Sequence, residues 1–151
     1  MIAGTIWNQL VTTLQENVNL AKYVKYVYEG RRYDMEPDAL PCIMLEPVSN
    51  AETQRDMNQI KDLYFNVDIY AFSNANYHQF PKTIVGGQTN KGILDIENDI
   101  RGCLVSSNTL GDKVIDIRLE PSLFDLIDTD KYPVRGMRIP IKILYRQNNG
   151  V

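Results

Sequence analysis

The chain has 151 residues, of which 44% are hydrophobic and 23% charged, a composition typical of one folded globular domain. The formal net charge of -3 argues against a protein whose main task is to neutralise nucleic-acid phosphates. No stretch approaches the ~20 apolar residues that a membrane span needs, and the N-terminus lacks the pattern of a signal peptide. The two cysteines, Cys42 and Cys103, lie far apart. We therefore expect two buried, reduced thiols in a protein made in a reducing cytoplasm.

The first predicted element is an amphipathic helix. Apolar residues from Ile2 to Val18, including Trp7, Leu10 and Leu14, fall on one half of a helical wheel. Residues 23–28 then alternate β-branched and aromatic residues with lysine, which predicts a short strand, although continuation of the helix is an alternative. The compact apolar run Cys42 to Leu45 predicts a buried strand that ends at Pro47.

Residues 48–62 ("VSNAETQRDMNQIKD") are almost entirely polar, and a loop of this length is unusual inside a compact domain. We expect this segment to project as a mobile arm that becomes ordered against a neighbouring subunit or another partner. Its mixed charges would make that contact polar and sensitive to salt. The candidate contact residues here are Glu52, Arg55, Asp56 and Lys61.

The stretch Leu63 to Phe72 ("LYFNVDIYAF") alternates with a period of two and predicts a strand. Phe65, Val67 and Ile69 share one apolar face. The opposite face carries three aromatic residues, which would form an exposed patch in a monomer. Two explanations remain open: this face is covered by a neighbouring subunit, or it is covered within the same domain. The candidate contact residues are Tyr64, Tyr70 and Phe72.

A second long loop is predicted at about residues 74–91, followed by a helix over residues 91–105 with Asn90 as its N-cap. Alternating strands follow at residues 113–121 and 135–146. Pro140 lies inside the last of these and cannot donate to a strand ladder, so this strand is expected at an edge or with a bulge. The sequence thus predicts a single α+β domain over residues 1–151, with a mixed, mainly antiparallel sheet and two helices packed on one face.

Three basic residues, Arg138, Lys142 and Arg146, share one face of the last strand. They are candidates for contact with an acidic partner or with passing nucleic acid. The alternative is a solvated edge strand whose charges prevent aggregation.

The sequence offers no candidate catalytic, cofactor-binding or metal-binding residues. The only histidine, His78, lies in a polar loop without neighbouring ligands, and most zinc sites require several His or Cys residues. The acidic cluster "DLIDTD", residues 125–130, lacks the glycine and the spaced oxygen ligands of a calcium loop, so a solvated turn is expected there. We therefore expect a protein that is not an enzyme and that binds no cofactor.

The order of hydrophobic blocks resembles that of the tail terminator, or tail-completion, proteins of long-tailed bacteriophages. The blocks are the N-terminal helix, the "LPCIML" strand, the long polar loop, the strand Phe65 to Ser73, the helix "GILDIENDIRGCL" and a final pair of strands. The resemblance covers nearly the whole chain in layout but includes no invariant residue, and the long loops depart from it.

This resemblance implies a structural virion protein that closes into a homo-oligomeric ring, expected to be a hexamer. The ring would cap the tail tube and join it to the head connector, and DNA would pass through it without specific binding. The expected partners are other copies of the chain, the tail tube protein and the head connector or neck protein, without a membrane. The expected location is the virion tail or neck, and the host cytoplasm during assembly. The alternatives are a head-completion or neck adaptor protein, a small monomeric protein-binding module and a small enzyme.

Overall fold

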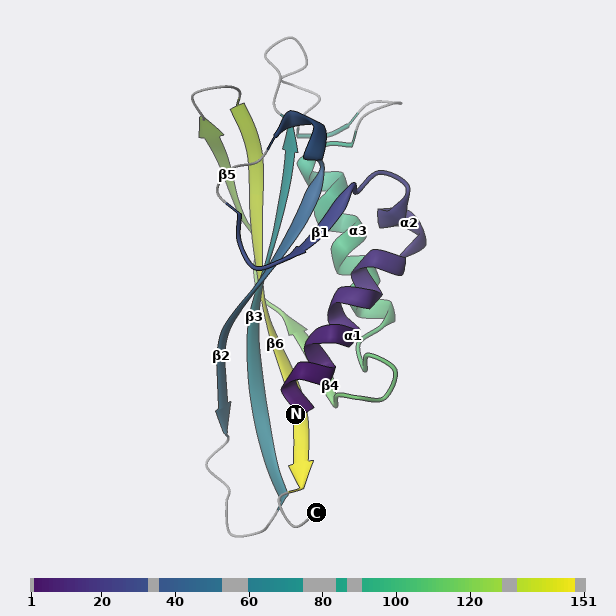
Figure 1. Cartoon of the computed structure of the whole chain (residues 1–151), viewed down its shortest axis with the longest axis vertical. Helices are drawn as coiled ribbons and strands as arrows, with labels where there is room; N and C mark the ends of the chain where they lie inside the picture. The colour runs from purple at the N-terminus through teal and green to yellow at the C-terminus, as the bar shows by residue number, and fades with distance from the viewer. Residues whose placement is uncertain are drawn as a thin grey trace.

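The computed structural model describes residues 2–32, 36–52, 60–74, 84–86, 91–128 and 133–148. It is an α+β fold, as predicted, with helices packed against one six-stranded sheet (Figure 1). The helical elements are α1 (Ile2–Glu16), α2 (Val18–Ala21), a 3-10 turn at Pro37–Ala39 and α3 (Ile93–Ser106). The strands are β1 (Tyr26–Glu29), β2 (Cys42–Glu52), β3 (Ile60–Asn74), β4 (Asp116–Leu119), β5 (Leu123–Asp128) and β6 (Pro133–Asn148).

The sheet is mixed and mainly antiparallel. Its strands lie in the order β1-β2-β3-β6-β4, and β5 pairs with β6 beyond the end of β4. Among the strands of the described residues, β1 and β2 pair in parallel and the other pairings are antiparallel. The helices α1, α2 and α3 lie on one side of the sheet, which we call the inner face (Figure 1). The opposite side is called the outer face.

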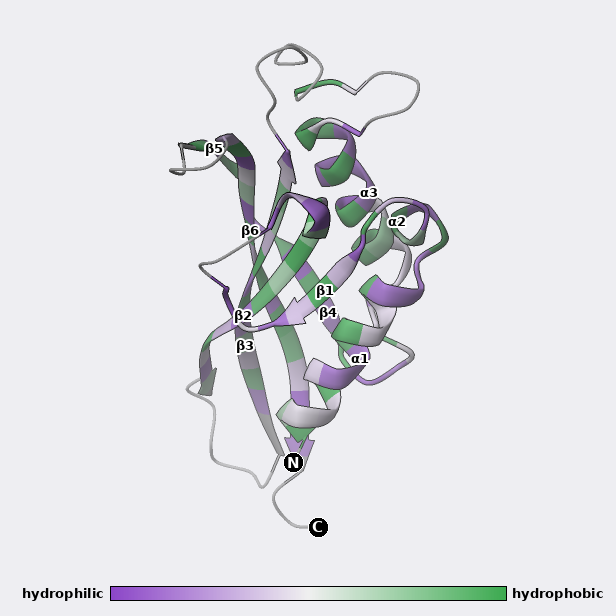
Figure 2. Ribbon diagram, turned by 45° about the horizontal axis from the view of Figure 1, so that its top comes forward, coloured by the Kyte–Doolittle hydropathy of each residue, from purple (hydrophilic) through white to green (hydrophobic). Residues whose placement is uncertain are grey.

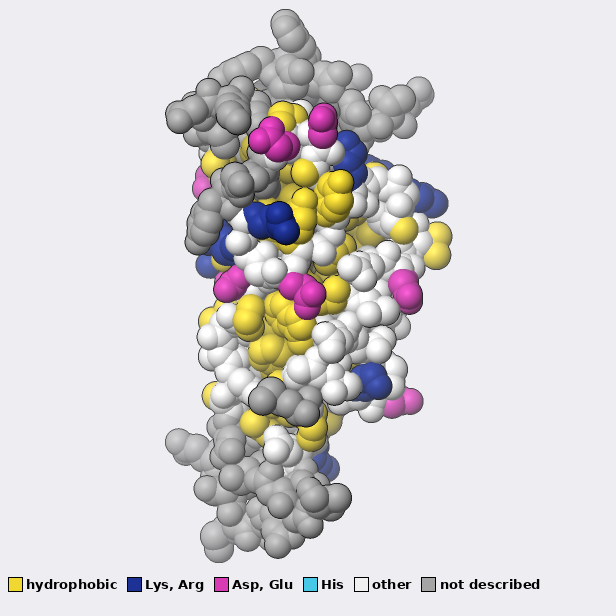
Figure 3. All heavy atoms as spheres, in the orientation of Figure 1, with side chains coloured by type: hydrophobic (Ala, Val, Ile, Leu, Met, Phe, Trp, Pro, Cys, Tyr) yellow, Lys and Arg dark blue, Asp and Glu magenta, His cyan; other side chains and the backbone are white. Residues whose placement is uncertain are grey.

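The main core lies between the helices and the inner face. The strands show alternating hydrophobic and hydrophilic bands along their length (Figure 2), so each sends every second side chain toward the helices. On β3 these side chains include the buried Phe65, Val67 and Ile69. Hydrophobic side chains also reach the surface around β1 and between β2 and α1 (Figure 3). The helices therefore leave part of this apolar surface uncovered.

The N-terminal helix is interrupted where the sequence predicted continuity to Val18. Asn17 adopts an extended backbone conformation, and its side-chain oxygen accepts hydrogen bonds from the backbone N–H groups of Asn19 and Leu20 at 3.1 Å each. This is the geometry of an N-cap, which satisfies donors that the start of a helix leaves free. The short helix α2 therefore begins at Val18.

The strands β2 and β3 extend well into the predicted 48–62 loop, so the boundaries of that loop were wrong. β2 passes Pro47 with a shift in register and reaches Glu52, and β3 already begins at Ile60. Polar residues are tolerated in these strand ends because they find polar partners across the sheet. The Asn50 side chain donates to the Tyr145 hydroxyl at 2.9 Å, and Asn66 donates to Ser49 at 2.8 Å. Residues 53–59, with most of the predicted 74–91 loop and His78, lie outside the described residues.

The last strand, β6, is central and not an edge, which corrects the expectation drawn from Pro140. It pairs with β3 along its whole length on one side, and with β5 and then β4 on the other. The carbonyl oxygen of Pro140 accepts a hydrogen bond from the Glu120 N–H at 2.9 Å. Pro140 therefore faces the junction between β4 and β5. At this junction residues 120–122 lie opposite Ile139 and Pro140 of β6. Proline has no N–H group to donate, but regular strand pairing is interrupted at this junction, so no regular inter-strand hydrogen bond is lost.

The helix α3 begins at Ile93 with Gly92 at its N-cap, whereas the sequence suggested Asn90. The Asp95 carboxylate accepts hydrogen bonds from the backbone N–H groups of Gly92, at 3.0 Å, and Gly86, at 2.7 Å. A Cβ atom at Gly92 would clash with the carbonyl group of Ile84. Glycine is thus required here by close approach of two backbone segments.

The junction between β4 and β5 is held by Arg101 of α3. Its guanidinium donates to the Glu97 carboxylate at 2.8 Å, to the Glu120 carbonyl oxygen at 2.7 Å and to the Ser122 hydroxyl at 2.7 Å. Ser122 in turn donates to Glu97 at 2.9 Å. Glu97 and Arg101 are four residues apart on α3, and their ion pair extends beyond the helix to anchor β5. The segment "DLIDTD", predicted as a turn, instead supplies the last four residues of β5, up to Asp128.

We expect Arg101→Ala to lower the free energy of unfolding by about 1–3 kcal/mol, because hydrogen bonds made by a charged group contribute in that range. Arg118→Ala, which removes an exposed arginine from neighbouring β4, is the matched control and should change stability by less than about 0.5 kcal/mol. Chemical denaturation measures both. Equal effects of the two substitutions would show that the Arg101 network does not anchor the junction.

Candidate interaction surface

The outer face brings together most of the residues predicted from the strand patterns. On β3 it presents Tyr64, Tyr70 and Phe72, and the register places them beside Leu144, Arg138 and Gly136 of β6. Lys142 and Arg146 follow on the same face of β6, opposite Asn66 and Asp62. The prediction that the three aromatic residues share one face, and that the three basic residues share one face, is therefore confirmed. Sequence periodicity was sufficient because both strands are regular over this length.

Each of the three basic residues of β6 on this face has a carboxylate partner. Arg138 lies 3.9 Å from Asp68, and Lys142 lies 3.9 Å from Glu120. Arg146 contacts Asp62 at 2.8 Å, and hydrogen bonding to Asp62 raises the pKa of its guanidinium. Exposed pairs of this kind contribute little to stability. They do, however, neutralise the basic row, so it is poorly suited to hold phosphate groups.

The part of the outer face that contains Phe72 is covered by another segment of the same chain. The segment between β1 and β2 crosses it, as a connection between parallel strands must. Gly30 takes a positive φ of 87° and donates its N–H to the Leu45 carbonyl oxygen at 2.7 Å, and the Arg31 N–H donates to Glu46 at 3.0 Å. A second buried cluster lies beneath this crossover, and it consists of Leu40, Cys42, Met44, Phe72 and Val134.

This arrangement decides between the two explanations for the aromatic face of β3. Phe72 is only 4% exposed and belongs to the second cluster, so it is buried within the domain. Tyr70 packs against that cluster and lies parallel to Phe72, with ring centroids 6.3 Å apart. Tyr64, nearer the other end of β3, remains partly exposed.

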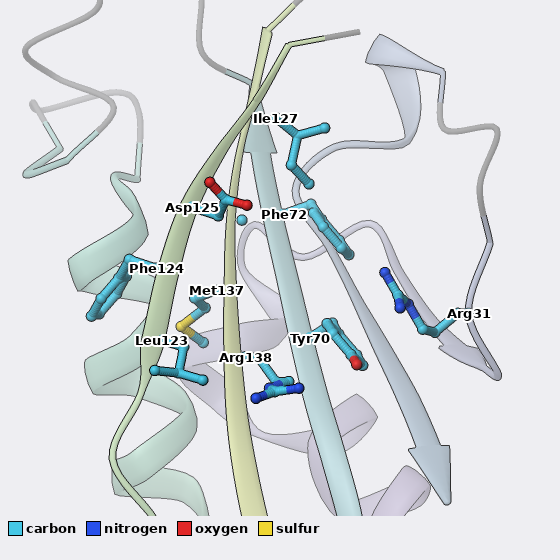
Figure 4. Close-up of a pocket in the computed structure, with 10 residues that line it drawn as sticks. Arg31, Tyr70, Phe72, Leu123, Phe124, Asp125, Ile127, Met137 and Arg138 are labelled. Carbon is cyan, nitrogen blue, oxygen red and sulfur yellow. The ribbon is translucent and has the colours of Figure 1, made fainter.

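A hollow of about 310 Å³ opens on the outer face between the crossover and β5. Arg31 and Arg138 lie on either side of Tyr70, and β5 contributes Leu123, near Arg138, and Ile127, near Phe72 (Figure 4). The Arg31 guanidinium lies 4.4 Å from the centre of the Tyr70 ring, a cation–π distance. The remaining lining residues are Phe72, Phe124, Asp125, Gly136 and Met137.

Glycine at position 136 shapes the floor of this hollow. A Cβ atom there would lie 3.1 Å from the nearest carbon of the Phe72 ring, so glycine leaves room for this ring to approach β6 closely. The hollow therefore combines fixed aromatic rings, two guanidinium groups and aliphatic side chains. Arginine and aromatic residues in such a setting are the groups enriched at the centres of protein interfaces.

The hollow also contains residues that the sequence did not identify. Arg31 follows a short predicted strand, and no pattern in the sequence indicates where the chain runs after that strand. Ile127 was missed because residues 125–130 were predicted to form an acidic turn, and Leu123 lies just before that segment. The alternation Leu123, Asp125, Ile127 was a usable strand signal.

The candidate residues of the polar segment are not brought to the hollow. Glu52 pairs with Leu63, and Lys61 pairs with Gln147, at the end of β3 that lies away from Phe72. Arg55 and Asp56 lie outside the described residues. The predicted contact residues therefore belong to two separate regions of the sheet.

Both cysteines are buried thiols that form no disulfide bond, as the sequence predicted. Burial raises the pKa of the Cys42 thiol to about 12, and it also raises the pKa of the Cys103 thiol. Both thiols stay protonated near neutral pH and should react poorly while the protein is folded.

Among the described residues, no group of three His, Cys, Asp or Glu side chains could hold a metal ion. Within the same part of the chain, no helix is both long and apolar enough to cross a membrane.

Comparison with known proteins finds a similarity in structure but none in sequence. No family model matches the chain, and no curated protein matches its sequence. A solved structure does share the fold: "Virion of native gene transfer agent (GTA) particle". The match has a TM-score of 0.55 at 10% sequence identity and covers 97% of this chain and 98% of that chain. The two chains are thus alike in fold over nearly their whole lengths, with no large part of either left over.

Proposed function

We propose that this chain is a structural protein of a phage-like virion and, within that class, a ring-forming tail terminator. It would cap the tail tube and join it to the head connector, with no catalytic activity. The observation that carries the proposal is the fold shared from end to end with a chain of a gene transfer agent virion. The order of hydrophobic blocks, which resembles tail terminators, supports the finer assignment.

Features of the outer face are consistent with this role. A hollow lined by tyrosine, phenylalanine and arginine suits a protein partner, such as the tail tube protein or the neck protein. The paired state of Arg138, Lys142 and Arg146 suits a ring through which DNA passes without specific binding. The assembled protein would reside in the virion and reach it from the host cytoplasm.

Removal of the gene from a particle-producing cell tests the role. Loss of a tail terminator should produce tubes of uncontrolled length without attached heads, which electron microscopy of lysates would show. Loss of a neck adaptor, the alternative in the same assembly, should instead leave tails of normal length that fail to join heads. Particles of normal form and infectivity would overturn both assignments and favour a protein-binding module outside the virion.

Light scattering coupled to size exclusion tests the ring. We expect a multiple of the 17.3 kDa chain mass, either for the free protein or after addition of tail tubes. A species that stays monomeric at high concentration in both conditions would contradict a ring-forming subunit.

A further inference from the structure

We infer that strand β5 of one copy of this chain docks along the β1 edge of a second copy. The inference rests on the proposed function, because it names the contact through which successive subunits would join. Its physical basis is that the two ends of the sheet are complementary in hydrophobicity, charge and strand direction.

Both ends of the described sheet have a strand with one partner only. At one end β1 pairs with β2, and at the other end β5 pairs with β6. A strand that pairs on one side presents a row of backbone donors and acceptors on the other, ready to bind a further strand. Proteins that remain monomeric commonly protect such edges with lysine or proline. β5 ("LFDLID") contains neither.

The β5 edge is apolar on both faces. Leu123 on the outer face is 53% exposed, and Phe124 and Leu126, which alternate to the other face, are 48% and 40% exposed. Asp125, which lies between Phe124 and Leu126, is also exposed and carries a negative charge. Three large neighbouring apolar side chains on a free strand edge would be costly to leave in water. This edge is accordingly apolar with a negative charge.

The start of β1 is apolar with positive charge, whereas Glu29 at its other end is negative and accepts a hydrogen bond from Trp7. A hollow of about 240 Å³ lies where β1 meets α1 and α2. Tyr26, at the start of β1, is 51% exposed beside it, and Lys22 and Lys25 are exposed in the segment that leads into β1. The hollow is lined mainly by aliphatic side chains, namely those of Leu14, Leu20, Ala21, Val24 and Val27, together with Gln15, Lys25 and Tyr26. The apolar side chains of β5 could pack into this hollow, and Lys22 and Lys25 would attract the Asp125 carboxylate.

Strand direction fits the same contact. β5 runs antiparallel to β6, β6 to β3, and β3 to β2, whereas β1 is parallel to β2. β5 and β1 therefore run in opposite senses along the sheet, so a neighbouring copy that is rotated to offset the twist of the sheet would pair them antiparallel. The two edges lie at opposite ends of the strand order. A contact between different surfaces repeats from copy to copy and closes into a ring when the rotation permits.

Cysteine cross-linking tests this contact directly. Leu126→Cys and Tyr26→Cys place one thiol on each edge, and a short bis-maleimide joins thiols that come within its reach. We expect a cross-linked dimer when the two single variants are mixed, and a ladder of higher species from the double variant. Each single variant alone should give no dimer. The buried native thiols, whose pKa values are raised, should add little background.

A charge substitution supplies an independent measurement. Phe124→Asp should weaken self-association by about tenfold or more, since the contact would bury an unpaired carboxylate. Val105→Asp is the matched control: it introduces the same charge at an apolar residue of α3 that is 66% exposed, and it should leave association unchanged. Thermal unfolding of both variants establishes that they remain folded.

The outcomes separate this contact from the proposed function. Cross-linking of the Leu126→Cys variant with itself would indicate a symmetric β5–β5 contact and overturn the inference. Rings that form without the Leu126–Tyr26 cross-link, and that tolerate Phe124→Asp, would also overturn it while leaving the virion role intact. A protein that gives neither oligomers nor cross-links, with or without tail tubes, would overturn the contact and the ring together.

Discussion

Replacement of Phe72 by alanine is expected to lower the free energy of unfolding by about 3–5 kcal/mol, the range for truncation of a buried aromatic side chain. Phe72 is 4% exposed on the outer face, where it packs with Leu40, Met44 and Val134 beneath the β1–β2 crossover. Removal of its ring would leave a cavity over Gly136, which has no side chain to fill it. Chemical denaturation measures the loss.

Tyr64→Ala is the control for this prediction, because Tyr64 lies on the same face of the same strand but is partly exposed. We expect it to cost about 1 kcal/mol or less, as is usual for a surface substitution. A cost below about 1 kcal/mol for Phe72→Ala would mean that the crossover does not bury this face. The aromatic face of β3 would then have to be covered by a neighbouring subunit, which is the other explanation suggested by the sequence.

Leu10→Ala in α1 is expected to destabilise the protein by about 2–5 kcal/mol, since the surrounding core relaxes only partly around a truncated side chain. Leu10 is fully buried between α1 and the inner face of the sheet, in the cluster that also contains Ile6 and Leu14. Asn8→Ala, at an exposed position of the same helix, keeps the backbone context and should change stability by less than about 0.5 kcal/mol. Equal stability of the Leu10→Ala variant and the parent protein would show that α1 is not packed on the sheet.

These two substitutions probe opposite faces of one sheet, so their effects should be nearly additive. Leu10 belongs to the inner cluster, and Phe72 belongs to the outer cluster. Sites without shared contacts usually combine independently.

The sequence alone determined the elements whose side chains repeat with a clear period. The alternation from Leu63 to Phe72 and from Met137 to Tyr145 identified β3 and β6 and the faces on which their residues lie. The helical spacing of Ile6, Leu10 and Leu14 identified α1. The α+β class followed from these elements, because periodicity records directly which side of each element is buried.

Only the tertiary structure decided the features that depend on a distant partner. Polar residues at the ends of β2 and β3 form strand because backbone hydrogen bonds across the sheet stabilise them, and such bonds leave no mark on side-chain periodicity. Pro140 is accommodated in a central strand because the junction between β4 and β5 happens to lie opposite it. Arg31 reaches Tyr70 because the crossover passes over that particular strand. Each of these outcomes depends on which segments become neighbours in space, and a pattern confined to one segment contains no information about its neighbours.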